Sequence, residues 1–181
     1  MKKTFLFLLL LAVQTLTAQE PYSVQMADSF MKAQPDSIRV SETKPPRWDY
    51  EQGLILKALE KVWVKTGDAR YFNYIKKEID LYVKQDGGIA TYKYDDFNID
   101  NIPPGRLLLM LYQQSLPGKE KYKKAADLLW KQLENQPKTK EGGYWHKKRY
   151  PYQMWLDGLF MGEPFAAGYS RIFNRPEHFE D

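Results

Sequence analysis

Apolar residues recur every three or four positions in six segments of the chain, which is the period of an amphipathic α-helix. The expected helices cover residues 24–31, 50–62, 72–82, 106–114, 122–133 and 155–173. Gly162 and Pro164 are expected to interrupt or bend the last one. Strand-like patterns are confined to two short pieces, Ile89 to Tyr94 and Gly143 to His146. The pattern therefore predicts an all-α fold.

Two parts of the chain repeat the same order of features. A polar, lysine-rich helix leads to a glycine pair, a short strand-like piece and an aspartate, first at Gly87-Gly88 and Asp100, then at Gly142-Gly143 and Asp157. The glycine pairs are 55 positions apart and the aspartates 57, and Asp49 lies 51 positions before Asp100. Each unit is predicted to be an αα-hairpin with an amphipathic outer helix and a more apolar inner helix. Such hairpins bury their apolar faces by stacking side by side.

Three of these units fit into the sequence, and Asn174 to Pro176 is typical of a loop into a fourth. A ring of about six hairpins of ~50 residues each needs roughly twice this length. The expectation is therefore half of a ring, truncated at the C-terminus. If the native chain ends at Asp181, apolar stretches such as Leu107 to Leu111 and Leu159 to Phe165 are expected to face water.

The first residues predict an export signal. Lys2 and Lys3 precede the apolar run Phe5 to Val13, which is too short to span a bilayer, and small or polar residues follow up to Ala18. Residues 1–18 are therefore expected to be a signal peptide and residues 19–181 the mature domain. The sequence has no cysteine, which suits a protein exported to a bacterial periplasm and stabilised by its core alone. No membrane partner is expected after cleavage.

Charge and composition limit the classes of molecule that the protein is expected to bind. The formal net charge is +4, and the lysines are spread along helix faces rather than gathered into a stripe, so no nucleic acid partner is expected. The 13 Tyr, 9 Phe and 5 Trp suit core packing as well as stacking on sugars. Packing is the expected role of Trp48, Trp63, Trp130 and Trp145.

Candidate chemistry is concentrated at two aspartates near predicted helix starts. Asp157 follows Trp155 closely, and Asp100 precedes the apolar helix that begins at Arg106. Two carboxylates on separate loops suit acid/base chemistry on a carbohydrate. Each also has a plainer interpretation, because aspartate commonly caps helices and forms turns.

Neighbouring charged residues leave alternatives open. Asp49 is expected to cap the helix that begins at Tyr50, with lining of a cavity as the alternative. Arg106 either binds a substrate carboxylate or forms an ion pair with Asp100. His178, near the chain end, receives no role.

Three segments around these aspartates carry a family resemblance. They are Trp48-Asp49-Tyr50-Glu51-Gln52-Gly53, then Asn98-Ile99-Asp100-Asn101-Ile102 with Gly105-Arg106, and finally Gly143-Tyr144-Trp145-His146 through Tyr150-Pro151 to Met154-Trp155-Leu156-Asp157-Gly158-Leu159-Phe160-Met161. In these residues and their order the chain resembles glycoside hydrolase family 105, the unsaturated rhamnogalacturonyl hydrolases. The resemblance implies an (α/α)6 barrel, of which residues 19–181 are about the first half. Family 88, the unsaturated glucuronyl hydrolases, shares that barrel but matches less well around Tyr150 to Met161.

The resemblance implies a specific reaction. The implied substrate is a lyase-generated pectin (rhamnogalacturonan) oligosaccharide with a 4,5-unsaturated uronic acid at its non-reducing end. Family members hydrate the double bond: a carboxylic acid protonates C4, water adds at C5, and the resulting hemiketal opens the ring. Neither a metal nor an organic cofactor is implied.

The same resemblance assigns roles to individual residues. Asp157 is implied to be the general acid/base, and Asp100 the second catalytic carboxylate, which holds sugar hydroxyls. Trp155 and His146 are implied to bind the substrate, with Lys147 as a candidate for contact with its carboxylate.

Two other classes of protein stay open as alternatives. A non-catalytic helical-repeat carbohydrate-binding module would explain the repeats and the aromatic residues, but not carboxylates at equivalent positions beside Trp and His. A polysaccharide lyase would need a Tyr or His base with Arg or Lys to neutralise a uronate, and the run Met154 to Gly158 argues against it.

Overall fold

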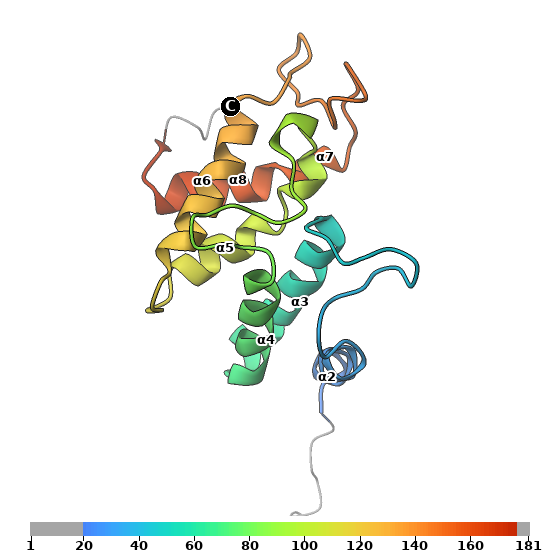
Figure 1. Ribbon diagram of the computed structural model, residues 1–181, viewed down its shortest axis with the longest axis vertical. Helices are drawn as coiled ribbons and strands as arrows, with labels where there is room; N and C mark the ends of the chain where they lie inside the picture. Colours follow the sequence, from blue (N-terminus) through green and yellow to red (C-terminus); the bar gives the residue numbers. More distant parts are fainter. Residues whose placement is uncertain (1–19, 177–181) are drawn as a thin grey trace, which may run out of the picture.

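The computed structural model of the protein describes residues 20–176 and is built from α-helices (Figure 1). The helices are α2 (Tyr22–Ala33), α3 (Tyr50–Thr66), α4 (Ala69–Asp80), α5 (Gly105–Tyr112), α6 (Glu120–Glu134), α7 (Gly158–Met161) and α8 (Glu163–Ile172), with two short 3-10 helices, η1 (Tyr94–Asp96) and η2 (Ile99–Asn101), before α5. Within residues 20–176, β-structure is limited to isolated bridges. The predicted all-α fold is confirmed.

The helices pack as successive hairpins. Helix α3 packs on α4 and α5 on α6, while α3 contacts α5 and α5 contacts α8 in an inner row. The outer helices α2, α4 and α6 each pack on the inner helix that follows them. Figure 1 shows this progression from α2 at the lower end of the view to α6 and α8 at the upper end. The predicted alternation of outer and inner helices is therefore present.

Equivalent hydrogen bonds join neighbouring outer helices. The hydroxyl of Tyr71, in α4, donates to Asp28 Oδ1 of α2 at 2.6 Å. The hydroxyl of Tyr122, in α6, donates to Asp80 Oδ1 of α4 at 2.7 Å. Both tyrosines are the third residue of their helix, so the same contact fixes two successive units.

Burial of α5 corrects one expectation. Leu107 to Leu111 are at most 7% exposed, because α3, α6 and α8 all pack against this helix. The expected exposure of this stretch was therefore wrong. Leu159 and Phe160 are exposed as predicted, at 65% and 42%, whereas Phe165 is fully buried.

Helix boundaries follow from capping residues. The Asp49 side chain accepts a hydrogen bond from the Tyr50 N–H at the start of α3, which confirms the predicted cap. Gly67 ends α3 with φ of 70°, a left-handed conformation that glycine adopts without a Cβ penalty. Asp68 then caps α4 by accepting from the Arg70 N–H at 2.8 Å.

The internal repeat is visible in the backbone. An isolated bridge pairs Val83 with Ile89, and a second pairs Lys138 with Tyr144. Each encloses a turn whose glycine, Gly87 or Gly142, has φ near 90°. Both turns are thus built alike, 55 positions apart, as the glycine pairs predicted. The predicted strand-like pieces form these single bridges and no longer strands within residues 20–176.

The sixth predicted helix is divided. Helices α7 and α8 meet at Gly162, and Pro164 lies in the first turn of α8, where a missing N–H carries no cost. The predicted start at Trp155 was wrong, because residues 153–157 lie in the loop and turn before α7.

Two predictions concern residues outside the described range. The signal peptide at residues 1–18 and His178 both lie there. In residues 20–176 no helix combines the length and hydrophobicity that a membrane span requires.

Candidate functional site

The structure brings together the predicted site residues from two segments far apart in the sequence. Asp100 lies in η2, before α5. His146 and Lys147 follow the bridge at Tyr144, and Trp155 and Asp157 precede α7. One carboxylate oxygen of each aspartate and one ring nitrogen of His146 lie within 4.8 Å of one another. The two aspartates predicted from the repeat therefore belong to one cluster with His146.

His146 lies between the two carboxylates. Its Nε2 is 3.3 Å from Asp100 Oδ1, and its Nδ1 is 3.9 Å from Asp157 Oδ1. Lys147 Nζ lies 2.5 Å from the other oxygen of Asp100. The side chains of His146 and Asp100 are 1% and 9% exposed, whereas that of Asp157 is 45% exposed. Asp157 is thus the member of this cluster that solvent or a substrate can reach.

Neither aspartate of the cluster acts as a helix cap. Asp157 occupies the N-terminal cap position of α7, but its side chain makes no capping hydrogen bond. At η2 the cap is Asn98, whose side-chain oxygen accepts from the Asp100 N–H at 3.1 Å. Neither carboxylate is therefore used in a capping hydrogen bond, although both residues lie in turns, as the plainer interpretation expected.

Aromatic packing fixes the imidazole. The Trp155 ring stacks on His146 with centroids 4.0 Å apart and planes at 13°, and it also stacks with Tyr150 at 5.5 Å. Burial lowers the pKa of His146, against the opposing charges of Asp100 and Asp157. His146 is therefore neutral near pH 7. Its buried Nδ1 has no hydrogen-bond partner among the described residues.

Backbone hydrogen bonds connect the loop that carries Asp100 to the loop that carries His146 and Asp157. The Ile99 N–H donates to the His146 carbonyl at 3.1 Å, and the His146 N–H donates to the Gln153 carbonyl at 2.8 Å. These bonds tie His146 both to the segment that carries Asp100 and to the segment that leads to Asp157.

A third segment, before α3, is attached by reciprocal bonds. Trp48 Nε1 donates to the Asn101 carbonyl at 2.8 Å, and Asn101 Nδ2 donates to the Trp48 carbonyl at 2.9 Å. Trp48 is 1% exposed, which agrees with its predicted packing role. The loops before α3, α5 and α7 therefore meet at one end of the inner helices.

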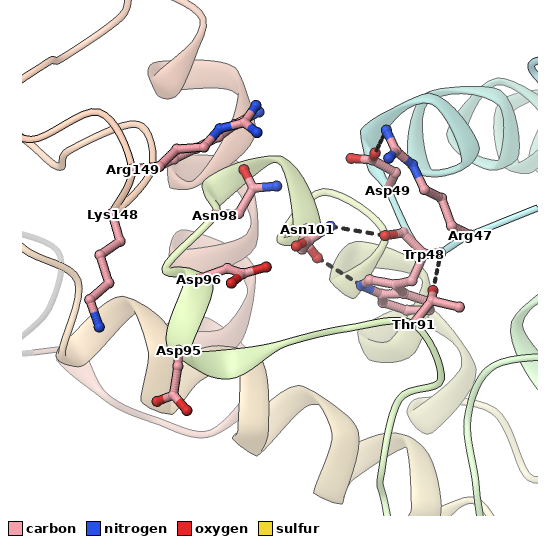
Figure 2. Close-up of a pocket in the computed structure, with 11 residues that line it drawn as sticks. Arg47, Trp48, Asp49, Thr91, Asp95, Asp96, Asn98, Asn101, Lys148 and Arg149 are labelled. Carbon is pink, nitrogen blue, oxygen red and sulfur yellow. Dashed lines mark hydrogen bonds and ion pairs between the residues drawn. The ribbon is translucent and has the colours of Figure 1, made fainter. Parts of the chain in front are cut away.

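These three loops enclose a cavity of about 500 Å3 (Figure 2). Its walls carry cationic side chains, carboxylates and amides: Arg47, Lys147, Lys148 and Arg149, Asp49, Asp95 and Asp96, and Asn98 and Asn101. Lys147 connects the cavity to the cluster, because its ammonium pairs with Asp100. A charged cavity of this kind suits a polar ligand.

Asp49 combines both roles considered for it. It caps α3 and also lines the cavity, where it pairs with Arg47 at 2.5 Å. Figure 2 shows these two side chains facing each other. Burial raises the pKa of Asp49, while its hydrogen bond from Tyr50 and the charge of Arg47 oppose that rise.

Arg106 does not form the ion pair with Asp100 that was one of the two contacts considered for it. Its Nε donates to the Pro103 carbonyl at 3.3 Å, and its guanidinium lies 4.8 Å from the centroid of the Phe160 ring. Burial lowers the pKa of Arg106, and the charge of Glu60 opposes this. The predicted pairing with Asp100 is absent from the ion pairs of residues 20–176.

The sequence did not single out Arg47, Asp95, Asp96, Lys148 or Arg149 as cavity residues. All lie within a few positions of the predicted aspartates or His146, so the repeat could have marked their segments as neighbours. The spacing of the repeat could not show which of these side chains point into the cavity.

The cluster of Asp100, His146 and Asp157 also has donor atoms that could hold a metal ion. Lys147 already places a positive charge against Asp100, which disfavours a second cation there. That no metal takes part remains a prediction.

Comparison with known proteins gives matches to one group of glycosidases. The family model described as Glycosyl Hydrolase Family 88 matches residues 22–181. The chain is 26% identical over 140 residues to the unsaturated rhamnogalacturonyl hydrolase YesR of Bacillus subtilis (strain 168), covering 74% of this chain and 38% of that protein.

Two solved structures share the fold. A family 105 glycoside hydrolase of C. acetobutylicum ATCC 824 is 38% identical with a TM-score of 0.78, covering 89% of this chain and 42% of that one. A possible family 105 member from Klebsiella pneumoniae subsp. pneumoniae MGH 78578 is 23% identical with a TM-score of 0.63, covering 74% and 34%. The chain thus spans less than half the length of these relatives, and the predicted half barrel and family resemblance are confirmed.

Proposed function

The chain belongs to Glycosyl Hydrolase Family 88, and from that premise we propose that the full-length protein is a glycosidase. Its proposed substrates are lyase-generated pectin (rhamnogalacturonan) oligosaccharides that end in a 4,5-unsaturated uronic acid. The observation that carries the proposal is the convergence of Asp100, His146 and Asp157 beside a cavity lined by charged and polar side chains. The likeness to an unsaturated rhamnogalacturonyl hydrolase supports the same substrate class.

In the proposed reaction, Asp157 is the proton donor. Its carboxyl transfers a proton to C4 of the enol ether, and the resulting carboxylate takes a proton from the water that adds at C5. The hemiketal formed at C5 opens to a ketone, and C1 then releases the hydroxyl of the next sugar. The net change is the addition of one water. The exposure of Asp157 supports this role, because the reacting carbon must come within hydrogen-bond reach of the acid.

The buried members of the cluster are assigned to binding and orientation. Asp100, held by Lys147 and His146, can accept hydrogen bonds from sugar hydroxyls. A neutral His146 can accept or donate a single hydrogen bond at its unpartnered nitrogen. Lys147 and the other cations of the cavity can offset the uronate charge. Trp155 is assigned to substrate binding beside the histidine on which it stacks.

The direct test follows the double bond. An unsaturated uronide absorbs ultraviolet light until the bond is hydrated, so the full-length protein is expected to remove that absorbance from an unsaturated rhamnogalacturonan disaccharide. Unchanged absorbance of the unsaturated disaccharide would contradict a role in this reaction. The saturated disaccharide, which has no double bond to hydrate, is the control and should stay intact.

A second substrate has specific support. The matched family model carries the number 88, the family of unsaturated glucuronyl hydrolases. An unsaturated glycosaminoglycan disaccharide should therefore be assayed in parallel. A higher kcat/KM for that substrate would reassign the sugar and leave the hydration chemistry unchanged.

We also propose that the protein is exported to a bacterial periplasm after loss of residues 1–18. The charged start, the apolar run and the small residues up to Ala18 support this. Mass spectrometry of the mature protein is expected to find Gln19 at or near its N-terminus. A mature chain that still begins at Met1 would refute export by this route.

A further inference from the structure

Two buried glutamines connect the loops of the candidate site. Gln136 Nε2 donates to the Phe97 carbonyl at 2.7 Å and to the Trp145 carbonyl at 2.8 Å. Its Oε1 accepts from Gln132 Nε2 at 3.1 Å, and Gln132 Oε1 accepts from the Tyr92 hydroxyl at 2.8 Å. Gln132 and Gln136 are 0% and 4% exposed. These bonds form a continuous buried chain from Tyr92 to both loops.

The partners fix the orientation of the Gln136 amide. Both of its N–H groups point at carbonyl oxygens, and its own oxygen faces an N–H donor. The reverse orientation would place an oxygen against two carbonyls, which repel it. All the polar atoms of this side chain are therefore used at once.

The two carbonyls belong to the segments that carry the cluster. Phe97 lies three residues before Asp100, and Trp145 directly precedes His146. Phe97 has φ of 42°, a left-handed conformation that a bulky residue adopts only when its surroundings hold it. The bond from Gln136 to Phe97 is a contact that can hold it there.

The repeat itself does not require this connection. The position 55 residues before Gln136 is Leu81, which is 50% exposed. Leu81 directly follows α4, and its apolar side chain cannot hydrogen-bond to two loops. The repeat alone therefore does not account for an amide at position 136, beside the loops that meet at the site.

We propose that Gln136 is a positioning residue that sets the distance between Asp100 and His146. The expected effect on turnover rests on the proposed function, whereas the expected effect on the position of the two loops does not. Loss of the amide leaves two partly buried carbonyls without a donor and lets the loops separate. A shift of about 1 Å in catalytic groups lowers turnover by up to about 100-fold.

The test uses Gln136→Met in the full-length protein, since methionine keeps the length of the side chain and removes both donors. The control is Tyr122→Phe, which removes a partly buried hydrogen bond to Asp80 between outer helices. Two readouts are needed: kcat and KM on the unsaturated disaccharide, and hydrogen exchange of the Ile99 amide, which donates to His146. The second readout needs no substrate.

Gln136→Met is expected to lower kcat by about 10- to 100-fold with a smaller change in KM, and to accelerate exchange at Ile99. Tyr122→Phe is expected to leave both close to wild type. The proposal is overturned by a kcat within about twofold of wild type, by unchanged Ile99 exchange, or by an equal loss of kcat in Tyr122→Phe.

Two further outcomes are separable. If the wild-type protein does not hydrate the disaccharide, the proposed function fails and Ile99 exchange alone decides the role of Gln136. If Gln136→Met does not fold, Gln136→Glu replaces it. Its carboxyl can donate one hydrogen bond only while protonated, so its loss of kcat relative to wild type should deepen as pH rises. A pH-independent ratio would overturn the proposal.

Discussion

At the scale of single residues, exposure distinguishes the members of the cluster. Asp157 reaches solvent, whereas Asp100 and His146 are buried and held by Lys147 and Trp155. The sequence indicated these five residues through their resemblance to a family motif, and the structure places them together. The sequence could not indicate that Asn98 caps η2, because that hydrogen bond depends on the geometry of the local turn.

Asp157→Asn is expected to lower kcat on the unsaturated disaccharide by at least about 100-fold, because an amide cannot donate and recover the proton. Folding should be preserved, since Asp157 makes no capping bond. Asp100→Asn serves as the comparison and should raise KM as well as lower kcat. Near-normal turnover by Asp157→Asn would refute its assignment as the acid.

The pH dependence of stability tests the burial of His146. Its folded-state pKa lies below the ordinary value of 6.5, so the unfolded chain binds the proton first as pH falls. The free energy of unfolding should therefore decrease as pH falls through 6.5, with a slope of at most about 1.4 kcal/mol per pH unit from this group.

Urea titrations between pH 5 and 8 would measure that slope. His146→Gln is expected to flatten it, and His178→Gln, which removes the other histidine, is the matched control. Identical slopes for wild type and His146→Gln would contradict the buried, neutral imidazole.

At the scale of elements, the positions of the helices follow from the local sequence pattern. The geometry of the loops depends on how the hairpins pack. The apolar period located most helices within a few residues. The start of α7 was misplaced because Trp155 continues the apolar pattern while the chain there forms a loop. The meeting of three loops depends on stacking of hairpins, which periodicity within one helix cannot report.

Glycine substitutions test how the repeated turn packs. A Cβ added at Gly87 would overlap the Cβ of Lys124 in α6, whereas one at Gly67 meets nothing within 4 Å among the described residues. Both glycines have positive φ. Gly67→Ala is therefore expected to destabilise by about 1 kcal/mol through strain alone. Gly87→Ala should lose about 1–3 kcal/mol more.

Denaturant midpoints of the two variants provide the measurement. Equal losses of stability would show that the turn after α4 does not press on α6 as the structure indicates.

At the scale of the whole molecule, apolar surface stays open at both ends of the row of hairpins. A groove of about 600 Å3 between α2 and α3 is lined by Met26, Phe30, Ile55 and Leu59. At the other end, Leu156 and Leu159 are 85% and 65% exposed. Stacked repeats normally cover such faces with further repeats.

Residues 19–181 expressed alone are therefore expected to be oligomeric or poorly soluble and essentially inactive, because exposed apolar patches associate. A form extended by about three hairpins should be monomeric and active. Size-exclusion chromatography and the absorbance assay compare the two. A monomeric, active 19–181 protein would show that no further hairpin is needed for folding or activity.

The position of solvent deuterium in the product tests the central claim most directly. The full-length protein would be incubated with the unsaturated disaccharide in D2O and the products followed by NMR. Hydration with proton donation by Asp157 predicts deuterium on C4, loss of the double bond, and release of the neighbouring sugar, all slowed by Asp157→Asn. Release of a free unsaturated uronate, seen before its 4,5 double bond is lost and before C4 carries deuterium, would show attack at the anomeric carbon and contradict the account.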